Sequence, residues 1–136
     1  MAKSRIIVIE DDSLMQRAIE RLLLAHGFTV DCFSSAEAFL EHGAGSDAAC
    51  LLLDIRLGGM SGVELRRGLH ASGSTLPVIF ITAFDSETTR HEALEAGCAA
   101  YLLKPFSASV LIDAIGTASG SPLLSGRDPA NSSPAR

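Results

Sequence analysis

Apolar residues gather in five short runs along the chain, and polar residues or turn signals separate the runs. These runs span residues 5–9, 28–33, 49–53, 77–82 and 99–104. The run at 49–53 stops abruptly at Asp54, and its apolar residues do not alternate with polar ones. Such a run is typical of a strand that is buried on both faces in the middle of a parallel sheet. The pattern therefore predicts five strands, with the run before Asp54 at the centre.

Helical spacing of apolar residues separates these runs. We expect Ser13 to cap the first helix, the segment from Ser34 to Glu37 to form a capping box for a short second helix, and Ser107 to cap the last one. Helices are also expected at residues 62–71 and 86–96. The first helix has apolar residues at helical spacing, namely Leu14, Ala18, Leu22 and Ala25, with Ile19 and Leu23 beside them.

Alternating strands and helices predict an α/β fold, in which right-handed crossovers place helices on both faces of a parallel sheet. We expect one domain at residues 1–118, because 136 residues suffice for a single hydrophobic core. Residues 119–136 are rich in Ser, Pro, Gly and Ala. This composition predicts a flexible tail that is too short and too polar for a second domain.

Composition and charge narrow the function. The net charge of −5 argues against nucleic-acid binding, which needs clustered Lys and Arg. No apolar run approaches the ~18 residues of a membrane span, and residues 1–5 carry no signal-peptide pattern, so a cytoplasmic location is expected. The three cysteines have no metal-ligand spacing and are interpreted as buried apolar residues. The four histidines also lack partners at ligand spacing and are expected at the surface.

Polar residues follow four of the five predicted strands. They are Glu10 and Asp11, Asp54, Thr82 and Lys104. Because the carboxyl ends of parallel strands lie on one edge of the sheet, these side chains are expected to meet. Acidic oxygens suit a small hard cation such as Mg²⁺, while a lysine and a hydroxyl can bind the remaining oxygens of a phosphoryl group. Asp54 is then the candidate nucleophile, as in enzymes that form aspartyl phosphates.

Several short motifs carry a resemblance to a known family. They are Val8-Ile9-Glu10-Asp11-Asp12, Leu53-Asp54-Ile55-Arg56-Leu57, Gly59-Met60-Ser61-Gly62, Ile81-Thr82-Ala83 and Lys104-Pro105-Phe106. In this order they resemble the receiver domain of two-component response regulators, over about residues 4–116. The segment at 76–82 is most similar to the branch that contains the nitrogen-fixation regulators.

The resemblance implies a flavodoxin-like (βα)5 fold, a doubly wound five-stranded parallel sheet with strand order 2-1-3-4-5. It also implies that Asp54 accepts a phosphoryl group from a histidine kinase or a small phosphodonor. Asp11 then binds Mg²⁺ directly, Glu10 acts through a metal-bound water, and the Arg56 backbone carbonyl is a further ligand. Asp12 lies one position beyond the acid pair and is interpreted as a flanking residue.

The remaining roles also follow from the resemblance. Thr82 and Lys104 bind phosphoryl oxygens, and the Lys104-Pro105 peptide is expected to be cis. Tyr101 is the switch aromatic, which turns inward when Thr82 moves toward the phosphoryl group. The output face is formed by residues 86–116, the fourth helix, fifth strand and fifth helix, for a downstream effector or a second copy. The kinase side of the exchange is a histidine kinase or a phosphotransfer protein.

Three other functions compete with this interpretation. A silent interaction module with the same fold is disfavoured because every required residue is present. A phosphatase needs an additional acid/base group and a substrate cap, and the sequence offers neither. A flavin-binding protein is disfavoured because the loop after the first strand is acidic. One departure from the family concerns rigidity, because Gly58 stands where the family often has proline.

Overall fold

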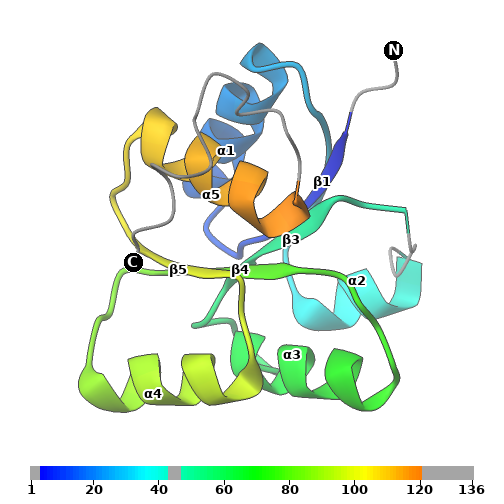
Figure 1. The fold of residues 1–136 in the computed structure, drawn as a ribbon, viewed down its shortest axis with the longest axis vertical. Coiled ribbons are helices and arrows are strands. Elements are labelled where there is room, and N and C mark those ends of the chain that lie inside the picture. Colours follow the sequence, from blue (N-terminus) through cyan, green and yellow to red (C-terminus); the bar gives the residue numbers. More distant parts are fainter. Residues whose placement is uncertain (1–3, 43–46, 121–136) are drawn as a thin grey trace.

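The computed structural model describes residues 4–42 and 47–120, which form a parallel sheet between two layers of helices (Figure 1). The sheet order is β2-β1-β3-β4-β5, and all four strand pairs are parallel. The strands are β1 (Arg5–Ile9), β2 (Thr29–Phe33), β3 (Cys50–Asp54), β4 (Val78–Thr82) and β5 (Ala100–Leu103). The predicted fold class and strand order are confirmed.

Five helices cover the two faces of the sheet. They are α1 (Ser13–Ala25), α2 (Ala36–His42), α3 (Gly62–Ala71), α4 (Glu87–Ala96) and α5 (Ala108–Ser119). In Figure 1, α1 and α5 lie on one face, and α2, α3 and α4 lie on the other. Among the described residues, none of these helices has the length and apolar character that crossing a membrane requires.

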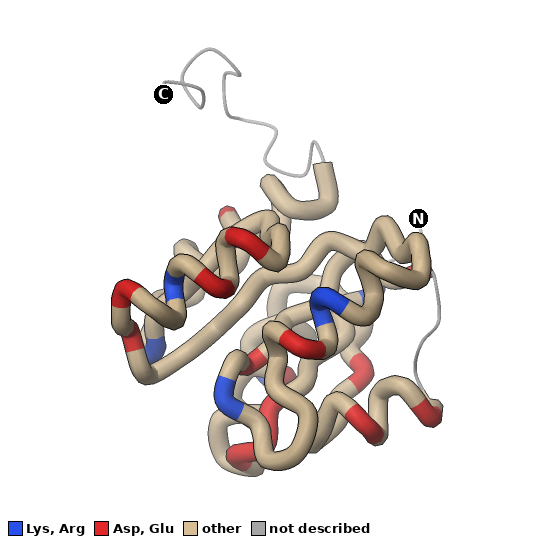
Figure 2. Tube along the Cα trace, turned by 90° about the horizontal axis from the view of Figure 1, so that it is seen from below, with Lys and Arg blue, Asp and Glu red and all other residues tan. Residues whose placement is uncertain are grey.

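Charged residues are distributed over several elements. Figure 2 shows Lys and Arg positions between Asp and Glu positions along the trace, without a large basic patch in that view. The whole chain has 11 Lys and Arg residues against 16 Asp and Glu residues.

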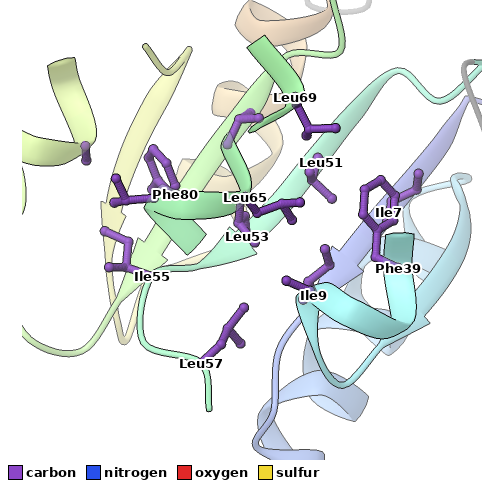
Figure 3. Packing of buried hydrophobic residues seen from close by; sticks show 14 residues of the cluster. Ile7, Ile9, Phe39, Leu51, Leu53, Ile55, Leu57, Leu65, Leu69 and Phe80 are labelled. Carbon is purple, nitrogen blue, oxygen red and sulfur yellow. The ribbon is translucent and has the colours of Figure 1, made fainter. Parts of the chain in front are cut away.

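The core consists of two apolar clusters, one on each face of the sheet. Successive side chains of a strand point to opposite faces, so Ile7 and Ile9 pack beneath α2 and α3 while Ile6 and Val8 pack beneath α1 and α5. Figure 3 shows the first cluster, with Phe39 of α2 near Ile7 and Ile9. Burying a large apolar side chain of this kind contributes about 1.5–3 kcal/mol. All five residues of β3 are buried, as expected for the central strand.

The structure corrects the predicted apolar face of α1. Leu14 is 79% exposed, and Ala18 and Ala25 are exposed as well. The residues that pack on the sheet are Ile19 and Leu23, which are fully buried, with Met15 and Leu22 partly buried beside them. The error has a simple cause, since apolar residues occur on more than one side of this helix and spacing alone does not decide which side faces the sheet.

Two predicted helix caps are also wrong. Asp12, and not Ser13, is the N-cap of α1, and its carboxylate accepts hydrogen bonds from the backbone of Leu14 and Met15. At α2, the hydroxyl of Ser35 accepts the hydrogen bond from the Ala38 N–H at 3.0 Å, so the cap is one residue later than Ser34. Adjacent Asp, Ser and Thr residues are all good caps, and the sequence cannot rank them. Ser107 does cap α5, as predicted.

The predicted tail falls largely outside the described residues. Helix α5 continues to Ser119, and Gly120 ends it with a φ of 66°, a left-handed conformation that suits glycine. The first two residues of the predicted tail therefore belong to the end of the helix. Residues 121–136 lie outside the described part of the chain, as does the predicted loop at 43–46.

Cysteines and histidines are not part of a site. Cys50 is buried and the other two cysteines are half-buried, and burial raises the pKa of the Cys50 thiol to about 12. All four histidines are exposed, as predicted.

Candidate functional site

The parallel register brings the polar residues at the strand ends to one edge of the sheet. Ile9 pairs with Leu53, Asp54 pairs with Ile81, and Thr82 pairs with Leu103. The residues that follow β1 therefore lie beside the end of β3, and those that follow β5 lie at the same edge beyond β4. These are the candidates from the sequence, and the structure places Glu10, Asp11, Asp54 and Lys104 together.

Three carboxylates form the acidic part of this cluster. Glu10, Asp11 and Asp54 each offer one oxygen, and these oxygens all lie within 4.8 Å of one another. Glu10 is 1% exposed and Asp54 is 4% exposed, whereas Asp11 is open to solvent. Asp12 points its carboxylate to the start of α1, so the flanking interpretation agrees with its position. Three hard oxygen ligands with one solvent-facing side are a donor set that fits Mg²⁺, which keeps several waters.

Lys104 joins the two buried acids. Its Nζ lies 2.6 Å from Glu10 Oε1 and 3.2 Å from Asp54 Oδ2. Burial by itself lowers the pKa of the Lys104 ammonium, but the hydrogen bond to Glu10 and the charge of Asp54 outweigh this effect, so the pKa is raised. The Lys104–Pro105 peptide bond is cis, as the sequence analysis expects. Lys104 is therefore a fixed positive charge beside Asp54.

Glu10 has a carboxyl group with a raised pKa. Burial raises the pKa of Glu10 to about 7, and the nearby Asp54 carboxylate acts in the same direction. The hydrogen bonds from Lys104 and from the Asp12 N–H, which is 3.1 Å from Oε2, oppose this shift. Without a bound cation, the protonated form of Glu10 therefore competes with the ionised form, which places a second negative charge beside Asp54.

Asp54 is held at the junction of β3 and the loop that precedes α3. Its Oδ1 accepts a hydrogen bond from the Arg56 N–H at 3.1 Å, and Oδ2 contacts Lys104. The loop closes when the Gly62 N–H donates to the Ile55 carbonyl at 3.0 Å. A Cβ at Gly62 would lie 2.4 Å from the Asp54 carbonyl oxygen, so only glycine fits against this backbone.

The predicted switch pair, Thr82 and Tyr101, forms hydrogen bonds with residues 84 and 85. Thr82 is fully buried, and its hydroxyl accepts a hydrogen bond from the Phe84 N–H at 3.0 Å. The Tyr101 hydroxyl donates to Asp85 at 3.3 Å, and Arg90 lies over the half-buried ring at 5.1 Å. Within the described residues, no hydrogen bond joins Thr82 to Asp54, so the structure brings the threonine to the edge but not into this contact.

Several contacts at this edge were not predicted from the sequence. The Gln16 side-chain amide donates to the carbonyls of Glu10 and Phe33, at 2.9 and 3.1 Å. The Arg56 guanidinium lies over the Phe84 ring, 4.4 Å from its centroid. Glu37 was seen only as part of a capping motif, but it reaches the loop before α3. These contacts join separate elements, and no local sequence pattern predicts them.

Comparison with known proteins decides the family. The model of the response regulator receiver domain matches residues 6–116 of this chain. The chain belongs to the response regulator receiver family. The motifs singled out in the sequence all lie within the matched range.

Relatives of this receiver domain include a nitrogen-fixation regulator. The transcriptional regulatory protein FixJ of Azorhizobium caulinodans is 35% identical over 120 residues, which are 88% of this chain and 57% of FixJ. The crystal structure of FixJ-N superposes with a TM-score of 0.81 at 33% identity, over 88% of this chain and 96% of that one. The predicted similarity to the nitrogen-fixation branch is confirmed.

A second solved structure bears on the acidic cluster. The receiver domain of the sensor histidine kinase PA1611 from Pseudomonas aeruginosa has a magnesium ion coordinated in its active-site cleft. It matches with a TM-score of 0.79 at 28% identity, over 88% of this chain and all of that chain. The receiver chain spans about half the length of the curated relatives it matches.

Proposed function

We propose that Asp54 of this receiver domain accepts a phosphoryl group from the phosphohistidine of a histidine kinase or a phosphotransfer protein. A carboxylate oxygen of Asp54 attacks phosphorus, the P–N bond to the histidine breaks, and the electron pair leaves with the imidazole. The observation that supports this assignment is the cluster itself. Asp54 lies 3.2 Å from the Lys104 ammonium and within 4.8 Å of two further acids.

The acidic cluster is the proposed Mg²⁺ site. Asp11 and Asp54 are the proposed carboxylate ligands, the Arg56 backbone carbonyl is the third protein ligand, and Glu10 acts through a metal-bound water. The magnesium ion in the related PA1611 receiver supports this choice of metal. When bound, the ion supplies positive charge that lowers the electrostatic barrier between the acids and an incoming phosphoryl group.

Lys104 and Thr82 are the proposed ligands of the phosphoryl oxygens. Lys104 already lies beside Asp54, whereas the Thr82 hydroxyl has to leave Phe84 to reach a new group there. The proposed switch therefore breaks the hydrogen bond between Thr82 and Phe84, and Tyr101 turns inward as Thr82 moves. Phosphorylation thus biases two arrangements of one loop and one aromatic side chain.

The face formed by α4, β5 and α5 is the proposed output surface. Leu94, Leu103 and Val110 on this face are each between 42% and 59% exposed, which supports contact with a downstream effector or a second copy of the chain. We further propose that the chain is a cytoplasmic signalling protein that catalyses only its own phosphorylation and dephosphorylation. The part of the predicted tail beyond the end of α5, residues 121–136, remains a proposed tail outside this unit.

The test is phosphoryl transfer from acetyl phosphate in the presence of Mg²⁺, followed by intact-mass measurement. The wild-type chain is expected to gain one phosphoryl group, and Asp54→Asn is expected to gain none. Asp47→Asn is the matched control, because Asp47 is exposed and lies before the opposite end of the same strand. Labelling of Asp54→Asn at wild-type stoichiometry contradicts the acceptor assignment. A wild-type chain that takes no label supports a silent interaction module instead.

A further inference from the structure

We propose that Glu37 of α2 is a positioning residue for the metal site, because its carboxylate holds the loop between β3 and α3 that carries the Arg56 carbonyl. This inference rests on the proposed function, which makes that carbonyl a metal ligand. Helix α2 contributes no residue to the acidic cluster itself. The role of Glu37 is to fix the position of the Arg56 carbonyl, which contacts the metal, and Glu37 itself does not touch the metal.

Glu37 makes two contacts with the loop. Its Oε2 accepts a hydrogen bond from the Met60 N–H at 2.8 Å. The same oxygen lies over Gly59, where an added Cβ would approach it to 2.7 Å. Gly59 has a φ of 76°, so glycine serves this position both by its backbone conformation and by the room that it leaves for the carboxylate.

The rest of the loop is restrained at its two ends and by the buried side chain of Leu57, which belongs to the apolar cluster beneath α3. The Gly62 N–H and the capping box of Ser61 and Glu64 fix the end that enters α3. Gly58 has no heavy atom near the position of an added Cβ. In the described part of the chain, the Glu37 hydrogen bond is the one that reaches the backbone of residues 57–60 from another element. Glu37 therefore restrains, through a backbone hydrogen bond, a segment that contains Gly58 and Gly59.

The contact is suited to a constant role at neutral pH. The hydrogen bond from the Met60 N–H lowers the pKa of the Glu37 carboxyl group, so the acceptor stays ionised. Met60 follows Arg56 by four residues and packs against the apolar cluster beneath α3. Holding Met60 shortens the free part of the loop, and a restrained carbonyl loses less freedom when it binds a cation.

The first experiment measures Mg²⁺ affinity of the unphosphorylated chain by calorimetry. We expect Glu37→Ala to weaken binding about threefold to tenfold, toward the lower end of the effects seen when groups that orient metal ligands are removed. Glu37→Gln keeps an oxygen that can accept the Met60 N–H, so its loss should be smaller. Glu41→Gln is the matched control on the same exposed side of α2 and should bind as wild type. The urea midpoints of all three variants should stay close to that of wild type.

The second experiment uses Gly59. Gly59→Ala displaces the Glu37 carboxylate and also strains a backbone with a φ of 76°, so it should weaken Mg²⁺ binding at least as much as Glu37→Ala. Adding Glu37→Ala to Gly59→Ala should cost less affinity than Glu37→Ala costs in the wild-type chain. Gly58→Ala is the control and should leave the affinity unchanged. Wild-type affinity in Glu37→Ala, with Asp11→Asn strongly weakened, overturns the role of Glu37 alone. Wild-type affinity in Asp11→Asn overturns the metal site of the proposed function, and the role of Glu37 with it.

Discussion

The Lys104 ammonium lies between two carboxylates that are almost completely buried. Lys104 contacts Glu10 at 2.6 Å and Asp54 at 3.2 Å, so one cation serves two potential anions. Such an arrangement is electrostatically incomplete without a further positive charge or a proton. Burial raises the pKa of Glu10 to about 7 in the metal-free chain, and the neighbouring Asp54 carboxylate acts in the same direction.

The raised pKa of Glu10 predicts that the stability of the metal-free chain depends on pH. The pKa of Glu10 is about 7 when folded and 4.5 otherwise, so below pH 4.5 the group is protonated in both states and has no effect. As the pH rises from 4.5 through 7, the unfolded chain releases its proton first, and the stability falls. Glu10→Gln should remove this slope and raise the free energy of unfolding by about 1–2 kcal/mol at pH 8.

The measurement is urea unfolding in EDTA at several pH values between 5 and 8. The control is Glu20→Gln, on the half-buried side of α1, which should keep the wild-type slope. Parallel pH profiles for wild type and Glu10→Gln would contradict the pKa assignment. Added Mg²⁺ should reduce the difference between the two chains, because the cation stabilises the ionised form.

The junction of β3 and α3 depends on a close approach of two backbones. Gly62 is the first residue of α3, and its Cα faces the Asp54 carbonyl. Alanine is normally the better helix residue by about 1 kcal/mol, so propensity alone predicts that Gly62→Ala stabilises the chain. The 2.4 Å approach of the added Cβ predicts the opposite, a loss of about 2–3 kcal/mol, since backbone atoms cannot move aside easily.

Urea unfolding distinguishes these two outcomes. Gly68→Ala is the matched control, because Gly68 lies within the same helix and an added Cβ there meets nothing within 4 Å. That variant should show the ordinary gain in helix propensity. A stabilised Gly62→Ala chain would mean that the loop relaxes more than this structure implies.

The elements that the sequence predicts well are those set by local patterns. The unalternating run before Asp54 identified β3, and the polar residue at its end identified the edge where the site forms. The caps of α1 and α2 failed because neighbouring side chains compete for the same role. The contacts of Glu37 and Gln16 were not predicted because each joins segments that only the tertiary fold brings together. The family resemblance, and not spacing, supplied the roles of Arg56 and Tyr101.

At the scale of the whole molecule, the proposed phosphodonor has to approach the sheet edge where Asp54 lies. Leu14 lies at the start of α1 next to this edge and is 79% exposed. Pro105 and Phe106 line a hollow with residues of α1 nearby. A large exposed apolar side chain such as Leu14 is suited to contact a protein donor but has no part in binding a small one.

Leu14→Ser should therefore slow phosphoryl transfer from a histidine kinase about tenfold and leave the rate with acetyl phosphate unchanged. Leu24→Ser is the matched control, because Leu24 is 52% exposed but lies at the other end of the same helix. The two donors are compared by intact-mass time courses. Equal slowing with both donors would show that Leu14 affects Asp54 itself and not the docking of a protein.

The position of β3 determines which part of the molecule can change conformation after phosphorylation. This strand has hydrogen-bonded neighbours on both sides and helices above and below, so the acceptor is mounted on the stiffest part of the fold. Strand β3 therefore cannot shift to accommodate the doubly negative phosphoryl group that is added to Asp54. The strain has to appear in the solvent-facing connection at residues 83–86, and amide exchange before and after phosphorylation should change there first.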